Sequence, residues 1–304
     1  KTDFENILGG NVKGGVNWNV DARNNFFANA GYYSKQPLFD AVYINFGNNL
    51  NPNLTNEKIT GFELGYGYRS SKFRANVNLY YTSWKDRFES TGATFNAGQP
   101  DEIRGTANIL GITQVHTGIE FDGRFQASDK FALTGMMSIG NWEYKDDVTA
   151  TYFDNDQAPI VIGGVEQVET LALDGVKVGD AAQFTAFLGA DYNVANNLNV
   201  DFGYRFAGNL YAQFDATSVG PDGALKLPSF GLADAGATYS IPFDDKKLSF
   251  RLNVNNLFDT TYIAESDTNI FAQPGDDTYD GINTSNRVFF GFGTTWNLSA
   301  RFNF

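Results

Sequence analysis

The sequence predicts an all-β protein, and within that class an antiparallel transmembrane β-barrel to which this chain contributes about 11 strands. Three observations predict this fold. Apolar and polar residues alternate with period two along almost the whole chain. The connections between the alternating stretches are short and long in turn. No apolar run reaches the ~18 residues that a membrane-spanning helix needs.

The composition agrees with a strand-rich protein that does not face water on all sides. Charged residues make up 19% of the 304 residues, below the roughly 25% that is usual for soluble domains. Aromatic residues make up 15%, with 28 Phe and 15 Tyr, and there are 32 Gly. Aromatic side chains suit a pleated surface, and glycine suits positions where the backbone bends or crowds.

Several classes of site and partner are disfavoured by composition. The chain has no Cys and a single His, His116, which argues against disulfides, thiolate metal sites and a histidine metal cage. The net charge of −13 and a pI near 4.5 disfavour nucleic acid as a partner. Residues 1–10, KTDFENILGG, have no basic region followed by an apolar stretch, so we expect no signal peptide in this chain.

The stretch FRANVNLYYTSW, residues 73–84, illustrates the expected strands. Phe73, Ala75, Val77, Leu79 and Tyr81 form one apolar row, and the residues between them form a polar row. The same alternation predicts eleven strands in chain order, at residues 12–20, 26–34, 59–69, 73–84, 111–126, 131–144, 179–194, 198–214, 227–241, 248–258 and 288–304.

The connections between these strands alternate in length without exception. The short ones carry Asp, Asn, Ser and Lys, which is the chemistry of tight turns between antiparallel strands. The long ones are rich in Asn, Asp and Gly and are expected at residues 35–58, 89–107, 148–177, 215–226 and 264–286. Outer-membrane barrels have this arrangement, with short periplasmic turns and long extracellular loops.

The polar rows indicate which face meets lipid. QVHTGIEFDGR places Glu120, Asp122 and Arg124 on one face and apolar residues on the other. We expect the apolar rows to face lipid, since we find no Arg or Lys at mid-depth in them, and the inward charges to pair across the wall or with a plug. Phe187 and Phe289 fall in rows assigned to the lumen, which a wide barrel tolerates.

The strand number predicts that this chain is part of a larger barrel. A closed single-chain antiparallel barrel needs an even number of strands, and eleven is odd. The last strand ends at the last residue, on the side of the short turns. We therefore expect residues 1–304 to be the C-terminal part of one barrel domain, with the remaining strands in a missing N-terminal part or in another chain.

Five segments carry a resemblance to a known family. Motifs of TonB-dependent outer-membrane receptors are resembled, in the family's order along the chain, by NPNLTNEKITGFELGYGYR (51–69), HTGIEFDGRF (116–125), LPSFGLADAGATY (227–239), LNVNNLFDTTY (252–262) and the C-terminal ARFNF. The resemblance implies a 22-stranded barrel, of which these would be the last eleven strands. It also implies an N-terminal plug domain and a TonB-contacting segment, neither of which we find in this chain.

The resemblance implies a function and a set of partners. We expect an outer-membrane receptor that binds a scarce nutrient through its extracellular loops and upper lumen for TonB-energised uptake, and not an enzyme. The implied partners are outer-membrane lipid, the plug and remaining strands, the TonB system, the nutrient and, as a candidate, a surface lipoprotein. Two alternatives stay open, a passive porin-like channel and a soluble β-rich adhesin.

Four residues are candidates for substrate binding. Tyr33, Trp84 and Tyr211 are expected to project inward near the outer rim, where an aromatic face with a polar group suits sugars or flat chelates. Packing at the rim or in the lipid interface explains them equally well. His116 lies in a luminal row without a Gly-x-Ser-x-Gly motif anywhere, so we expect it to make a hydrogen bond in the lumen and predict no catalytic residues.

The remaining motifs have structural interpretations. The acidic segments at residues 154–157 and 275–281 suggest Ca²⁺ ligands only loosely, because their spacing is not that of a Ca²⁺-binding loop. We expect solvated loops there, no cofactor and no metal site, and a charge that disfavours strongly anionic substrates. Residues 255–259, NNLFD, are expected to form hydrogen bonds where a strand leaves the membrane.

Overall fold

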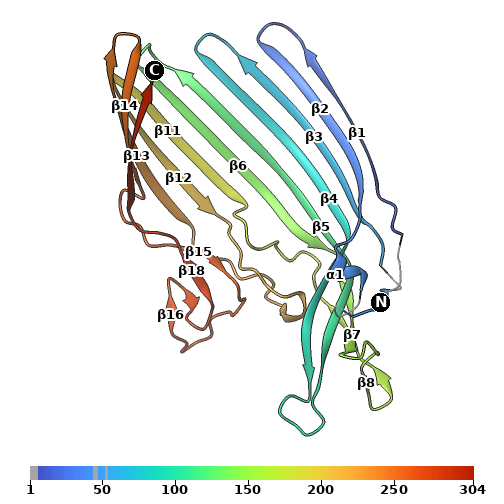
Figure 1. Cartoon of the computed structure of the whole chain (residues 1–304). Helices are drawn as coiled ribbons and strands as arrows, with labels where there is room; N and C mark the ends of the chain where they lie inside the picture. Colours follow the sequence, from blue (N-terminus) through green and yellow to red (C-terminus); the bar gives the residue numbers. More distant parts are fainter. Residues whose placement is uncertain (1–5, 44–46, 52–53) are drawn as a thin grey trace.

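The computed structural model describes residues 6–43, 47–51 and 54–304, and they form one broad, curved antiparallel sheet (Figure 1). Eleven strands follow one another in the order β1-β2-β3-β4-β5-β6-β11-β12-β13-β14-β19, and β7 and β10 extend the sheet beside β5. Each of the eleven pairs antiparallel with the next strand along this order. The eleven-stranded antiparallel fold predicted from the alternation is confirmed.

The wall strands and the extracellular elements have the following bounds. The eleven wall strands are β1 (Gly10–Asn19), β2 (Asn24–Lys35), β3 (Glu57–Arg69), β4 (Phe73–Phe95), β5 (Ile103–Gln126), β6 (Phe131–Lys145), β11 (Phe184–Ala195), β12 (Leu198–Gly208), β13 (Phe230–Phe243), β14 (Lys246–Asn255) and β19 (Thr295–Asn303). The other elements are α1 (Phe39–Val42), β7 (Val148–Asp154), β8 (Val161–Ile162), β9 (Val165–Glu166), β10 (Val168–Leu171), the 3-10 helix η2 (Ala216–Ser218), β15 (Ile263–Ser266), β16 (Thr278–Tyr279), β17 (Ile282–Asn283) and β18 (Val288–Phe290).

The short and long connections lie at opposite ends of the sheet. In Figure 1 the tight turns gather at the top, while the long connections, with α1, β7, β8, β15, β16 and β18, gather at the bottom. Because outer-membrane barrels have short periplasmic turns, the lower end in this view is the extracellular one. Within the described ranges, no helix is long and apolar enough to cross a membrane.

The apolar rows of neighbouring strands join into one band. On the first four strands Val16 is level with Ala28, Ala28 with Leu64, and Leu64 with Leu79. Large apolar side chains along this band are exposed: Val12, Val16, Trp18, Phe26, Phe62, Leu64, Leu79, Ile119, Met137, Leu188, Phe202, Leu252, Leu298 and Phe302. Exposed apolar area of this extent is unfavourable in water, at about 25 cal/mol per Å², and is suited to lipid.

The opposite, luminal face carries charges that pair across the wall, as expected. Arg124 on β5 pairs with Asp191 on β11, with Nη1 and Oδ2 3.2 Å apart. Asp122 accepts hydrogen bonds from Asn76 Nδ2 on the neighbouring strand β4, at 2.9 and 3.1 Å. Arg251 also pairs with Asp201 through both guanidinium nitrogens. The two ion pairs each join strands that are not neighbours in the sheet, β5 with β11 and β14 with β12.

Phe187 confirms the expectation of an inward-facing aromatic side chain. Its ring lies over Gly189 on its own strand and Gly203 on β12, where an added Cβ atom would be 2.8 Å from the ring carbons. The two glycines therefore provide the space that the ring occupies. Phe289 does not follow the prediction, because β18 pairs with β15 and not with the wall, so Phe289 belongs to an extracellular hairpin.

Several predicted strand ends are wrong, and residues with positive φ explain two of them. Residues 89–107 are not a long loop, because β4 and β5 continue to a short turn at residues 96–102. β12 ends at Gly208, followed by Asn209 with φ 50°. β11 begins only at Phe184, after Asp180 with φ 66°. The last strand begins at Thr295.

The NNLFD segment is structural, as predicted. Asn256 is 4% exposed and has φ 49°. Its Nδ2 donates to the carbonyl oxygens of Thr260 and Phe292, at 2.9 and 3.1 Å, and its Oδ1 accepts from the Thr260 N–H at 2.9 Å. The side chain thus satisfies backbone groups that the ladder no longer pairs beyond the end of β14.

The apolar cores of the chain lie among the extracellular segments, not inside the barrel. The first core joins β5, β6, β7 and β10 with the β12–β13 loop; its buried residues are Ala107, Ile109, Ile112, Tyr144, Val148, Ala150, Tyr152, Ile160, Leu171, Leu173, Val176 and Ala216. The second joins the β12–β13 and β14–β19 connections through Leu210, Ala212, Leu225, Leu227, Ile263 and Ile282. The long connections are therefore packed units.

The lipid-facing assignment predicts opposite effects of the same substitution at two adjacent residues. Met137 lies in the apolar band opposite Phe121, and Met136 lies in the luminal row opposite Asp122. Met137→Arg should lower the free energy of unfolding in lipid vesicles by about 2–4 kcal/mol, because it places a charge in hydrocarbon near mid-depth.

Met136→Arg is the matched control, since both methionine side chains are exposed, at 53% and 40%. The luminal arginine should cost much less, because it meets water and the Asp122 carboxylate. Urea titration of both variants, followed by the fraction of folded barrel, measures the difference. Equal destabilisation of the two variants would contradict the assignment of the faces.

Candidate functional site

Three of the four predicted binding residues lie near one another on the outer part of the luminal wall. Tyr33 on β2 is level with Ile59 on β3, and Ile59 is level with Trp84 on β4. His116 on β5 lies opposite Thr82, two residues from Trp84. The register of the sheet therefore brings together residues that are distant in sequence.

Trp84 is held by one carboxylate and two cations. Its Nε1 donates to Glu57 Oε2 at 2.8 Å, and Lys35 Nζ lies 2.8 Å from the same oxygen. Lys35 Nζ and Arg87 Cζ are 5.2 and 4.6 Å from the centre of the indole ring, within the range of cation–π attraction. A ligand that stacks on this ring would compete with these two cations.

The ring of His116 is also occupied by a neighbour. It stacks on Trp142, with ring centres 5.3 Å apart and planes 17° apart. Trp142 Nε1 donates in turn to the Tyr80 hydroxyl at 2.8 Å. Nε2 of His116 is buried and has no hydrogen-bond partner among the described residues. His116 thus belongs to an aromatic contact within the wall, and the hydrogen bond expected in the lumen is not formed by Nε2.

Tyr211 lies apart from the other three. β12 ends at Gly208, so Tyr211 is in the β12–β13 connection and its position does not follow from strand alternation. Its backbone forms a bridge with Lys226 and accepts a hydrogen bond from the Asp180 N–H at 3.0 Å. The premise that Tyr211 belongs to a wall strand is therefore wrong, and its role in binding stays a prediction.

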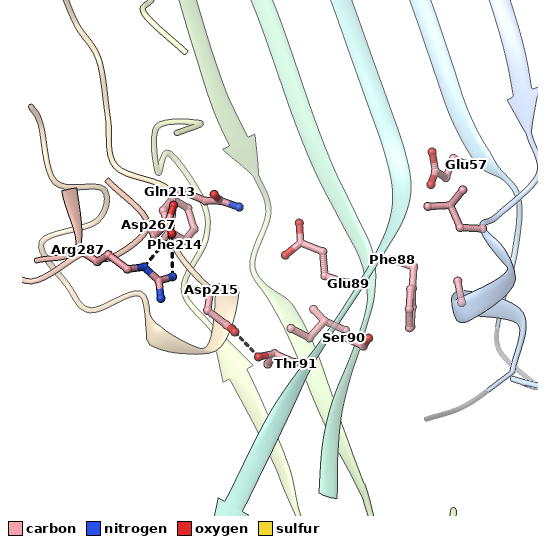
Figure 2. A pocket seen from close by; sticks show the side chains of 13 residues that line it. Glu57, Phe88, Glu89, Ser90, Thr91, Gln213, Phe214, Asp215, Asp267 and Arg287 are labelled. Atoms are coloured by element: carbon pink, nitrogen blue, oxygen red, sulfur yellow. Dashed lines mark hydrogen bonds and ion pairs between the residues drawn. The ribbon is translucent and has the colours of Figure 1, made fainter. Parts of the chain in front are cut away.

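A hollow of about 470 Å³ opens at the extracellular end of the wall (Figure 2). β4 contributes one side, and the β12–β13 and β14–β19 connections contribute the other. We call it the vestibule, and it is lined by Leu38, Ala41, Glu57, Phe88, Glu89, Ser90, Thr91, Ile109, Gln213, Phe214, Asp215, Asp267 and Arg287. Trp84 touches this hollow only through its hydrogen bond to Glu57.

The lining of the vestibule is acidic. It holds four carboxylates and a single cation, Arg287, which pairs with Asp267 at 2.8 Å. Glu57 is 7% exposed and is neutralised by Lys35. Asp215 accepts a hydrogen bond from Thr91 across the hollow (Figure 2). The charges therefore disfavour an anionic group at this place.

Glu89 is the carboxylate with the most altered environment in the vestibule. Burial raises the pKa of its carboxyl above the ordinary range; Arg87 opposes this, and the negative charge of Asp215 adds to it. The side chain points toward the β12–β13 connection, which carries Asp215 (Figure 2). A carboxyl group that keeps its proton more readily can donate as well as accept a hydrogen bond here.

Sequence alternation could not identify Glu89, because the inward-facing and outward-facing positions of β4 are exchanged between the wall and Glu89. Asp86 has φ 57°, and the register with β5 shifts between Trp84 and Arg87 and again before Glu89. One extra residue in a strand exchanges its two faces. On β4, even-numbered residues therefore face the lumen within the wall, and odd-numbered residues face inward in the extracellular part. Glu57, by contrast, lies in the luminal row of β3 and could have been selected from the alternation.

The two acidic loop segments hold turns together. Asp154 Oδ1 accepts from the backbone N–H groups of Asp156 and Ala158, both at 2.9 Å. Asp276 Oδ2 accepts from the Gln273 N–H and from Asn283 Nδ2, both at 2.8 Å. Across the described ranges no group of three or more His, Cys, Asp or Glu side chains is placed to hold a metal ion.

Comparison with known proteins identifies relatives of this sequence. The family model for the β-barrel of TonB-dependent receptor-like proteins matches residues 8–257. Over 213 residues, 70% of this chain, the sequence is 26% identical to an uncharacterized TonB-dependent receptor of Haemophilus influenzae. Over 116 residues, 34% of this chain, it is 32% identical to the catecholate siderophore receptor Fiu of Escherichia coli K12. These relatives are named as receptors, not as enzymes.

Solved structures show the same fold over almost the whole chain. The ferric-catecholate import receptor Fiu of E. coli K12 superposes with a TM-score of 0.60 at 17% identity, over 95% of this chain and 34% of Fiu. The siderophore receptor PiuA of Acinetobacter baumannii superposes with a TM-score of 0.62 at 15% identity, over 95% of this chain and 35% of PiuA.

The coverage shows that this chain corresponds to part of its relatives. The matched segment spans about half of the H. influenzae receptor, 53% of its length, and 14% of Fiu. The resemblance seen in the five sequence motifs is confirmed by a family model that covers most of the chain. The chain belongs to the β-barrel family of TonB-dependent receptors, and it forms part of the wall of an outer-membrane barrel.

Proposed function

We propose that this chain is the receptor wall and part of the ligand vestibule of a transporter that takes up a scarce nutrient across the outer membrane. The observation that carries the proposal is the vestibule itself. It lies at the extracellular end of a polar luminal wall, and its sides come from packed extracellular segments rather than from loose loops. A preformed hollow of this kind suits binding of a ligand before transport.

The family and the sheet edges support partners that complete the receptor. β1 and β19 lie at the two ends of the wall, and every residue of both strands is exposed. Unpaired backbone groups are costly in lipid. Because β1 and β19 are the first and last of eleven alternating strands, they run in the same direction. Antiparallel closure therefore needs an odd number of further strands, the first and last of which run opposite to β1 and β19. Self-closure adds no strand, and a second copy in the same membrane orientation adds eleven strands but would place parallel strands at both seams.

A plug in the lumen and energy from the TonB system are the further parts of the proposed mechanism. The luminal wall presents polar groups and ion pairs such as Arg124–Asp191 and Arg205–Asp234, to which a polar plug surface is complementary. The plug would hold the barrel closed until TonB acts. A surface lipoprotein remains a candidate partner at the extracellular end.

A passive porin is the less favoured function. The long connections of a porin leave an open water path, whereas here the β12–β13 connection is packed against the β4–β7 region through Ala216 and Phe214. Fiu and PiuA are siderophore receptors by name. We propose a metal chelate as the nutrient, and the acidic vestibule favours one that is neutral or positively charged where it enters.

Uptake by the full-length receptor should depend on energy. In cells that lack other receptors for the same iron chelate, uptake should fall to background when TonB is absent. The intact protein in a planar bilayer should be almost silent, because the plug blocks the lumen. Large, steady conductance together with TonB-independent uptake would identify a passive channel instead.

The charge of the vestibule predicts which chelates are accepted. A neutral ferric tris-hydroxamate complex should be taken up faster than the negatively charged ferric tris-catecholate complex at low ionic strength. The difference should shrink as salt screens the carboxylates, since the Debye length falls to about 8 Å at 0.15 M. Uptake of radiolabelled iron by cells measures both the difference in uptake rate and its dependence on salt. Preference for the tris-catecholate would contradict this choice of ligand class but not the receptor function.

A further inference from the structure

The β12–β13 connection is anchored in both extracellular cores. At its two ends Leu210, Ala212, Leu225 and Leu227 belong to the second core, and all four are at most 7% exposed. Between them Ala216, 3% exposed, is buried in the first core, and Phe214 packs against Tyr144 with ring centres 5.6 Å apart. We call residues 213–219 the strap.

A polar contact adds to the anchoring of the strap on β4. Thr91 Oγ1 donates to Asp215 Oδ2. The other oxygen, Oδ1, accepts from the Thr217 N–H at 2.9 Å and from the Thr217 hydroxyl at 2.7 Å. One carboxylate therefore both caps η2 and connects the strap to the opposite side of the vestibule. Figure 2 shows Asp215 and Thr91 facing each other across this gap.

The two anchors differ in strength. The second core holds the ends of the connection by Leu210, Leu225 and Leu227, which are large and nearly fully buried, so removing them from this apolar environment is costly. The first core holds the strap by one buried residue, the small Ala216, and by the partly buried side chains of Phe214 and Val219. If the connection opens, it should separate from β4 first, while its ends stay in place.

Glu89 lies where it can influence this separation. It is two residues before Thr91 and lines the same hollow as Asp215. The groups that act on it are Arg87 and Asp215, and Tyr144 lies close enough to respond to its charge. Two ionised carboxylates would repel each other, so the protonated form of Glu89 favours the attached strap.

We propose that the strap is a gate on the side of the vestibule, hinged in the second core and released from β4 when the Thr91–Asp215 contact breaks. Gln213, Phe214 and Asp215 form one side of the hollow, and β4 forms the other. Separation of these sides would open a path for the ligand into the lumen. This inference rests on the proposed receptor function and specifies the element that moves.

A cross-link tests the proposal. Residues 1–304 contain no cysteine, so Thr91→Cys with Asp215→Cys introduces the only two thiols of this part of the receptor. In the full-length receptor, joining them with a short, reducible thiol cross-linker should reduce chelate uptake at least tenfold. Reductant should restore it. Mass spectrometry measures how much of the receptor is joined.

The matched control joins two residues far from the vestibule. Ser240 and Ser249 face each other on β13 and β14 with hydroxyl oxygens 3.0 Å apart. Ser240→Cys with Ser249→Cys, joined in the same way, should leave uptake unchanged. Thr91→Val is a second variant that needs no reagent, and it should speed the release of bound chelate several-fold by weakening the attached state.

The outcomes separate the gate from the receptor function. Normal uptake by a fully joined Thr91→Cys/Asp215→Cys receptor would overturn the gate and leave the receptor function intact. Failure of the two thiols to join would also overturn it, because the strap would not lie against β4. Absence of uptake in the unmodified full-length protein would instead refute the proposed function.

Discussion

The structure depends on one constraint, the pairing of backbone hydrogen-bond groups in a solvent that cannot pair them. In hydrocarbon each N–H and C=O needs a partner in the protein, so the spanning strands must lie side by side in register. Register in turn fixes the faces, because a slip of one residue would move every apolar side chain to the lumen. The band of exposed apolar residues from β1 to β19 and the ion pairs on the opposite face are both consequences of this pairing.

Above the membrane a different constraint applies. The extracellular segments face water, and they are organised by two ordinary apolar cores with fully buried residues such as Ile109 and Leu173. β4 and β5 belong to both regions. β4 begins in the wall and ends in the extracellular region, and β5 begins there, beside β7, and ends in the wall. The register shifts at Asp86 and near Gly111 mark the place where the wall passes into the extracellular region, and the vestibule lies directly on the extracellular side of them. The vestibule is thus formed where β4 and β5 leave the wall and begin to pack against the extracellular segments.

The sequence could predict the regular part of this molecule and not the irregular part. Alternation is a local property, so eleven strands, their order and the lipid face could be read from residues such as 73–84. Glu89 and Tyr211 could not be placed, because a bulge changes the phase of β4 and a left-handed Asn209 ends β12. The extracellular cores bring together segments that are far apart in sequence, and no period in the sequence encodes those contacts. Trp84 was a reasonable candidate by type, but its partners Lys35 and Glu57 come from other strands.

The assignment of the two faces is the central claim, and the four tryptophans test it directly. Trp18 and Trp296 lie in the apolar band, 63% and 71% exposed, whereas Trp84 and Trp142 lie on the luminal side. Receptors that each retain one tryptophan can be folded into vesicles whose lipids carry bromine on the acyl chains, which quenches fluorescence on contact. The account predicts strong quenching of Trp18 and Trp296 and little quenching of Trp84 and Trp142. Equal quenching of all four, or quenching of the second pair alone, would contradict it.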